Sequence, residues 1–186
     1  MTVENDWAAP VKRLMTDNGM TEHHWIDVAQ ISVNPEVRKL CEQNACGHYG
    51  RNHMCPPGVK DIAEWEVIIR SFTQGLLVSK AYPTQDSFDF EAMTKAAVDF
   101  DKTLRRIKAA CQEKWPEKAL LLLGAGPCRH CNPCAYVDGE LCRFPDQAYP
   151  SVEACGINVV ELVRNVGARY SNGKNTVTYF GMILFR

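Results

Sequence analysis

Hydrophobic positions along this chain repeat with a helical period in some segments and form short unbroken runs in others. Residues 88–115 contain no Gly or Pro and return to apolar residues about every 3.6 positions, which predicts one long amphipathic helix. Apolar runs predict strands at residues 25–33, 75–81, 119–123 and 176–185, and shorter helical patterns predict helices at residues 35–41, 61–72, 151–155 and 158–166. The first 20 residues are weakly patterned.

The alternation of these strands and helices predicts the fold class. The strand at 75–81, the long helix and the strand at 119–123 form a unit that favours a right-handed crossover between parallel strands. The run at 119–123 (ALLLL) is typical of a central strand buried on both faces. We therefore expect one α/β domain over residues 1–186, with a single sheet of about four mostly parallel or mixed strands and flanking helices.

Composition and charge exclude several classes of protein. Hydrophobic residues make up 46% of the chain and charged residues 23%, as in ordinary globular proteins. The formal net charge is -1 and no long basic run is present, so nucleic acid is not an expected partner. No apolar stretch approaches the roughly 18 residues that span a bilayer, and the start MTVENDWAAP is acidic where a signal peptide is basic. We expect a cytoplasmic protein that does not bind membranes.

Two segments break the hydrophobic pattern and contain most of the cysteines. The segment at about 41–58 includes CGHYGRNHMCPPG, and the segment at about 124–150 is rich in Pro and Cys, so both are expected to be loops on which function depends. The chain has nine cysteines. An odd number, in a chain with no export signal and with enough residues for a core, argues against a disulfide framework and favours metal ligation.

The second of these segments has the most specific motif. Cys128, Cys131 and Cys134 form C-x2-C-x2-C, and Cys142 follows in LCRFP. The triplet matches the ferredoxin spacing for a [4Fe-4S] cluster, although the fourth cysteine comes after seven residues instead of about three. A structural zinc site with four cysteine ligands is the alternative, but such sites normally have two separated C-x2-C pairs.

The first segment has three candidate ligands and no evident fourth. Cys41, Cys46 and Cys55 form C-x4-C-x8-C and predict a second metal or cluster, with water, a small molecule, His53 or Cys155 completing it. If they share a cubane, their sulfurs should converge within about 6 to 7 Å, and the two loops should lie together at one end of the sheet. Alternatively, one or two of these cysteines are ordinary buried residues.

The remaining candidates are weaker. Cys111 lies within the long predicted helix and is expected to be a core thiol, and Cys155 is either a core thiol or the missing ligand. Arg129 and His130 lie between cysteines of the triplet, where positive charge would raise the reduction potential of a cluster, or else they are simply exposed to solvent. Asp101 is expected on the solvated face of the long helix.

Several short motifs together resemble a known family. They are CGHYG from residue 46, CPP from residue 55, GPCRHCNPC from residue 126, CRFP from residue 142 and SVEACGINV from residue 151. In this combination the chain resembles a family of small prokaryotic proteins of unknown function that are predicted to bind metal. The likeness covers residues 35–166. It implies metal of the iron-sulfur type, bound by the cysteines at 41, 46, 55, 128, 131, 134 and 142, and it implies no reaction.

Three functions are compatible with these residues. The first is a protein with one or two [4Fe-4S] clusters that passes electrons to a redox partner protein. The second is an enzyme whose cluster at Cys41, Cys46 and Cys55 has one iron open to a substrate or cofactor. The third is a structural zinc protein or a metal-delivery module, in which the cysteines serve only folding or metal transfer.

Overall fold

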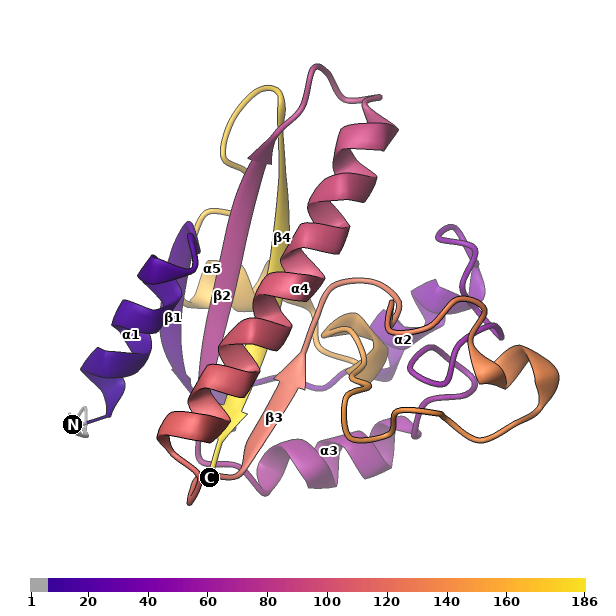
Figure 1. The fold of residues 1–186 in the computed structure, drawn as a ribbon, viewed down its shortest axis with the longest axis horizontal. Helices are drawn as coiled ribbons and strands as arrows, with labels where there is room; N and C mark the ends of the chain where they lie inside the picture. The colour runs from indigo at the N-terminus through magenta and orange to yellow at the C-terminus, as the bar shows by residue number, and fades with distance from the viewer. Residues whose placement is uncertain (1–6) are drawn as a thin grey trace.

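The computed structural model describes residues 7–186 and contains one antiparallel sheet (Figure 1). Residues 1–6, which include the acidic start of the chain, lie outside the described residues. Within residues 7–186 the sheet has four strands in the order β1-β2-β4-β3. The strands are β1 (Glu22–Asp27), β2 (Gln74–Pro83), β3 (Leu120–Leu123) and β4 (Thr176–Phe185).

Most predicted helices are present, and side chains cap the first turns of α2 and α3. The α-helices are α1 (Ala8–Asp17), α2 (Pro35–Glu42), α3 (Ile62–Arg70), α4 (Phe90–Lys114) and α5 (Val159–Asn165), and the 3-10 turns are η1 (Val28–Gln30), η2 (Ala135–Asp138) and η3 (Glu153–Cys155). The side chain of Asn34 accepts a hydrogen bond from Glu36 N at the start of α2, and Asp61 and Glu64 form a capping box at the start of α3. Among residues 7–186, no helix is long and apolar enough to cross a membrane.

The sheet separates two hydrophobic cores. One core lies between the sheet and the helices α1 and α4, and the other lies between the sheet and the helices α3 and α5 (Figure 1). Alternate residues of a strand enter opposite cores, so that Leu76 and Val78 of β2 pack beneath α4 while Leu77 packs on the other side. Both faces of the sheet are therefore covered, which explains the nearly continuous apolar runs of β2, β3 and β4.

The predicted parallel or mixed sheet is wrong, because every strand pair is antiparallel. β2 and β3 do point the same way, as a strand-helix-strand unit requires, but they are not neighbours. β4, the last strand in the chain, lies between them and runs antiparallel to both, with Met182 opposite Leu77 on one side and Leu123 on the other. Hydrophobic periodicity indicates that a strand exists, but it does not indicate which strand becomes its partner.

Two further expectations about single elements differ from the structure. β3 is at an edge of the sheet and not in its centre, because coverage of both faces produces the same apolar run at either place. The weakly patterned N-terminal segment contains α1, in which Val11 and Met15 are one turn apart and fully buried. That i, i+4 pair is a usable sequence signal for the helix.

An ion pair between β2 and α4 makes stability depend on pH. Lys80 Nζ and Tyr82 Oη each donate to Asp99 Oδ2, both at 2.8 Å. The hydrogen bond from Lys80, followed by that from Tyr82, lowers the pKa of Asp99 below its ordinary value, although burial opposes the shift. A carboxyl with a lowered folded-state pKa stabilises the fold above its unfolded pKa, and this contribution disappears as the pH falls through the folded pKa.

Replacing Asp99 with Asn should therefore lower the free energy of unfolding at pH 7 by no more than about 1 kcal/mol, because the carboxylate is half exposed. The difference between variant and wild type should shrink as the pH falls below about 4. Urea denaturation at several pH values measures it, with Glu91→Gln, which breaks a more exposed pair on the same helix, as the control. A difference that does not change with pH would contradict the assignment.

Candidate metal centre

The two cysteine-rich segments lie side by side beyond the β3 edge of the sheet (Figure 1). We call residues 43–61, between α2 and α3, the N-terminal loop, and residues 124–152, between β3 and η3, the C-terminal loop. Asn52 Nδ2 of the first loop donates to Cys128 O of the second at 2.9 Å, and His53 Nε2 lies 2.8 Å from Glu140 O. These hydrogen bonds join the two loops directly.

Close packing at Gly58 holds the loops together. A Cβ atom at this position would lie 2.6 Å from Cε2 of Tyr136 in the C-terminal loop and 2.9 Å from Asn52 O. No side chain fits in that space, so glycine is required at the end of the CPPG sequence for the loops to approach this closely. Asn52 is only 5% exposed, which shows that the contact excludes water.

The base of the C-terminal loop is closed by backbone hydrogen bonds. Gly124 N donates to Pro150 O at 2.9 Å, and Val152 N donates to Gly124 O at 3.0 Å. Between these two ends the backbone contains only turns, bends and η2. The sheet therefore fixes where the loop starts and ends, while its interior has no regular hydrogen-bond ladder to hold it.

Cys55 of the N-terminal loop interacts electrostatically with several other candidate thiols. Burial raises the pKa of Cys55 to about 12, and the neighbouring thiols of Cys46 and Cys41 contribute, followed by Cys128 and Cys134 of the C-terminal loop. Cys41, which lies on the last turn of α2, has its own pKa raised first by burial and then by Cys46. Cys55 is thus an electrostatic neighbour of thiols from both loops.

The C-terminal triplet also interacts internally. Burial raises the pKa of the Cys131 thiol, the thiols of Cys134 and Cys128 raise it further, and a hydrogen bond from the backbone of Ala135 opposes the shift. Cys142 lies farther along the same loop with a partly exposed thiol. All nine cysteines are free thiols, as expected for a chain without a disulfide framework.

Proximity of the thiols does not amount to a closed coordination shell. Across residues 7–186, no group of three or more His, Cys, Asp and Glu side chains is placed so as to hold a metal ion. The fold brings both sets of cysteines to one region, and the assignment of the seven as ligands stays a prediction.

A cavity of about 590 Å³ lies between parts of the two loops and α4. Its walls are formed by Gly47, His48, Arg51, Asn52, Val98, Pro127, Cys128, Arg129, Cys131, Asn132, Pro133, Cys134 and Val137. No carboxylate is among these residues. Burial lowers the pKa of His48, and the positive charges of Arg129 and Arg51 lower it further. The cavity therefore combines three thiols with a positive field, which suits a group that carries negative charge.

Another residue at this site is not foreseen from the sequence. Arg105, in the middle of α4, reaches the C-terminal loop, and its Nη2 lies 3.9 Å from Cys128 Sγ. Arg105 Nε donates to Asp101 Oδ2 at 2.9 Å. The expectation that Asp101 belongs to a solvated helix face is wrong, since Asp101 is 9% exposed beneath the loop. Helical periodicity shows where the apolar stripe lies, but it does not show that an irregular loop covers polar positions beside that stripe.

The weaker candidates have structural partners. Cys111 of α4 is fully buried against the sheet, as expected, and Cys155 is fully buried in the opposite core. Arg129 Nη1 donates to the backbone oxygens of Ala125 and Pro127 at 3.1 and 3.2 Å, so it stabilises the start of the C-terminal loop, to which it belongs. The ring of His130 packs edge-on against Phe144.

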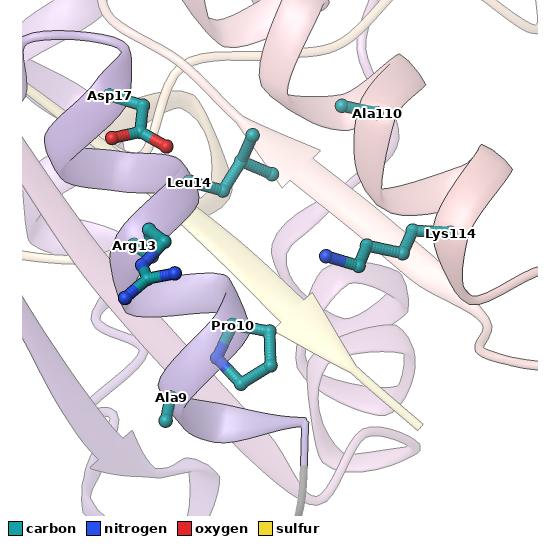
Figure 2. A pocket seen from close by; sticks show the side chains of 7 residues that line it. All are labelled: Ala9, Pro10, Arg13, Leu14, Asp17, Ala110 and Lys114. Atoms are coloured by element: carbon teal, nitrogen blue, oxygen red, sulfur yellow. The ribbon is translucent and has the colours of Figure 1, made fainter.

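A second hollow lies apart from the cysteines, between α1 and α4. Figure 2 shows its lining, which consists of Ala9, Pro10, Arg13, Leu14, Asp17, Ala110 and Lys114. Its volume is about 380 Å³, and no thiol or imidazole faces it. It is a groove between two packed helices and has no group that points to chemistry.

Comparison with known families identifies the chain. A family model described as predicted metal-binding protein (DUF2284) matches residues 24–185. This chain belongs to that family. Membership confirms the resemblance seen in the sequence motifs, and it extends the likeness through β4. The family description attributes metal binding to its members and specifies no reaction.

Comparison with solved structures finds a distant likeness. A structure of epoxyqueuosine reductase from Streptococcus thermophilus superposes with a TM-score of 0.45 and 10% sequence identity over 95% of this chain and 45% of that chain. A selenomethionine-labelled epoxyqueuosine reductase gives a TM-score of 0.44 and 8% identity over 95% of this chain and 44% of that chain. This chain therefore spans less than half the length of either. A comparison with curated proteins finds no match.

Proposed function

We propose that this member of a predicted metal-binding family is an iron-sulfur protein that passes electrons to a partner protein. The observation that supports it most directly is the cavity between the loops, which has three cysteine thiols in its walls and cations but no carboxylate. The remaining candidate thiols lie on the same two loops or on the helix α2, which leads into the N-terminal loop. Thiolate is the ligand that iron-sulfur clusters require, and hard cations such as Mg²⁺ or Ca²⁺ require oxygen ligands instead.

The side-chain chemistry of the two loops suits such a group, because the candidate ligands are all thiols. Cys128, Cys131, Cys134 and Cys142 would hold a [4Fe-4S] cluster, which supplies one-electron oxidation and reduction when bound. Because a cluster with four thiolate ligands is an anion, the positive charges of Arg51 and Arg129 in the cavity wall would offset its charge. Asn52, through its bond to Cys128 O, would keep the N-terminal loop in register with the first ligand.

A second cluster would be held by Cys41, Cys46 and Cys55, and its fourth position raises a second candidate function. Cys155 is fully buried in the core beneath α3 and α5, and His53 Nε2 lies 2.8 Å from Glu140 O. Both side chains proposed from the sequence as the fourth ligand are thus engaged elsewhere. The second candidate function is therefore an enzyme with one open coordination position at this site. A change in the visible absorption spectrum of the protein on adding cyanide would favour this second function.

Anaerobic purification tests the proposed function. The protein should be brown, absorb broadly at about 400 nm and contain iron and sulfide. Replacing Cys131 with Ser should remove about half or more of the bound iron, because a cubane on the triplet loses one of its ligands. Cys111→Ser is the matched control and should keep the iron content of the wild type, since Cys111 is buried in the core beneath α4.

Two results would contradict the proposal. A colourless protein that contains zinc would favour the structural zinc protein. Full iron content and an unchanged visible spectrum in Cys131→Ser would exclude a cluster at the triplet.

A further inference from the structure

Arg105 contacts both ends of the C-terminal loop. Its Nη2 lies 3.9 Å from Cys128 Sγ near the start of the loop, and its Nη1 donates to Gln147 O near the end at 2.7 Å. One turn along α4, Lys108 Nζ donates to Asp146 O at 3.1 Å. A single guanidinium thus bridges two points that are 19 residues apart in sequence, on a segment with no regular hydrogen-bond ladder.

Buried partners fix the position of this guanidinium. Arg105 Nε donates to Asp101 Oδ2, and the Arg105 guanidinium lies over the ring of Tyr149, 4.7 Å from its centroid. Tyr149 Oη donates to Asp101 Oδ1 at 2.5 Å, and both Asp101 and Tyr149 are buried. Gly124 leaves room for this ring, because a Cβ there would lie 2.5 Å from Tyr149 Cε2. The guanidinium group of Arg105 therefore has little freedom to turn away from Cys128.

We infer that Arg105, held by Asp101 and Tyr149, is a positioning residue that donates a hydrogen bond to the Cys128 sulfur and fixes both ends of the C-terminal loop around a cluster. This inference rests on the proposed function as far as the cluster is concerned. The contacts of Arg105 with the loop are independent of any metal.

The opposite charges of Arg105 and Asp101 should have opposite effects on the reduction potential of a bound cluster. A cation that donates to a ligand sulfur stabilises the reduced cluster, which carries one more negative charge than the oxidised cluster, and so raises the reduction potential. Asp101 is an anion next to that cation and opposes its effect. Removing Arg105 and removing the charge of Asp101 should therefore shift the potential in opposite directions, whereas a loss of packing alone would not produce opposite signs.

Anaerobic redox titration followed by visible absorption measures these shifts. Arg105→Gln should lower the one-electron equilibrium constant for reduction about tenfold, which corresponds to about 59 mV. Asp101→Asn, which keeps an oxygen for Tyr149 to donate to, should raise the potential. Arg105→Lys keeps the charge and should recover more than half of the lost shift. Arg106→Gln is the matched control, since Arg106 is the next residue of α4 and its Nη2 donates to Thr103 Oγ1.

A potential of Arg105→Gln equal to that of Arg106→Gln would overturn the inference. Shifts of the same sign in Arg105→Gln and Asp101→Asn would also overturn it.

Hydrogen exchange in the metal-free protein separates this inference from the proposed function. Arg105→Gln should exchange faster than the Arg106→Gln control at residues 128–129 and 146–149, the two ends of the loop. Equal exchange in the two variants would overturn the positioning role, whether or not the wild type holds iron. A colourless wild type with faster exchange in Arg105→Gln would support the loop contacts and would exclude the iron-sulfur function.

Discussion

Removing the metal from the purified protein is expected to raise amide hydrogen exchange in both loops about tenfold or more. Ordering backbone costs roughly 1 to 2 kcal/mol per residue, and the C-terminal loop buries little apolar surface to offset that cost. Val137 and Leu141 are 55% and 89% exposed, and the backbone between the closed ends of the loop has few ladder hydrogen bonds. Ligation by thiolates would supply the missing free energy, so its loss should loosen the loops.

The sheet should keep its protection in the same experiment. β2 and β4 pair along their whole length, and the core beneath α4 contains none of the seven cysteines proposed as ligands. Exchange in β2, β4 and α4 should therefore be the same before and after anaerobic chelation, and mass spectrometry of peptic fragments resolves these segments from the loops. Equal protection of the loops with and without metal would show that ligation does not stabilise them.

Replacing Phe100 with Ala is expected to lower the free energy of unfolding by about 3 to 5 kcal/mol, the usual range for a buried phenylalanine. Phe100 is 1% exposed at the centre of α4, and its ring stacks on Tyr179 of β4 with centroids 5.9 Å apart. The substitution would leave a cavity between helix and sheet that neighbouring side chains cannot fill without leaving their own positions.

The same helix offers a matched control for that experiment. Phe90 lies in the first turn of α4 and is 68% exposed, so Phe90→Ala should change the free energy of unfolding by less than about 0.5 kcal/mol. Urea denaturation of the two variants and the wild type measures both effects. Equal destabilisation by the two substitutions would show that α4 is not the main cover of this face of the sheet.

The positions of most helices and strands follow from the sequence by itself. The long helix at α4 and the strand at β4 are predictable because apolar spacing over many residues reports a face that must be buried. The capping residues Asn34 and Asp61 mark helix starts for a local reason, since their side chains satisfy backbone N–H groups within three residues. The two irregular segments are evident as well, because their Gly and Pro residues interrupt both periods.

The candidate ligands are also a local feature. The spacing of Cys128, Cys131 and Cys134 is enough to indicate a cluster motif, because so few intervening residues limit how far apart the thiols can be. The same reasoning gives only a hypothesis for Cys41, Cys46 and Cys55, whose spacing is longer. In the folded chain, Cys55 is an electrostatic neighbour of thiols from both loops.

Tertiary structure alone decided the partners of these local features. β4 inserts between β2 and β3 and makes the sheet antiparallel, because strand pairing depends on contacts between residues about 60 to 110 positions apart, on which local periodicity has no bearing. Asp101 and Arg105 look like solvated helix residues until the C-terminal loop covers them and brings Cys128 Sγ to 3.9 Å from the guanidinium. A cysteine motif can be found in a sequence, but the charges that surround it come from other elements of the fold.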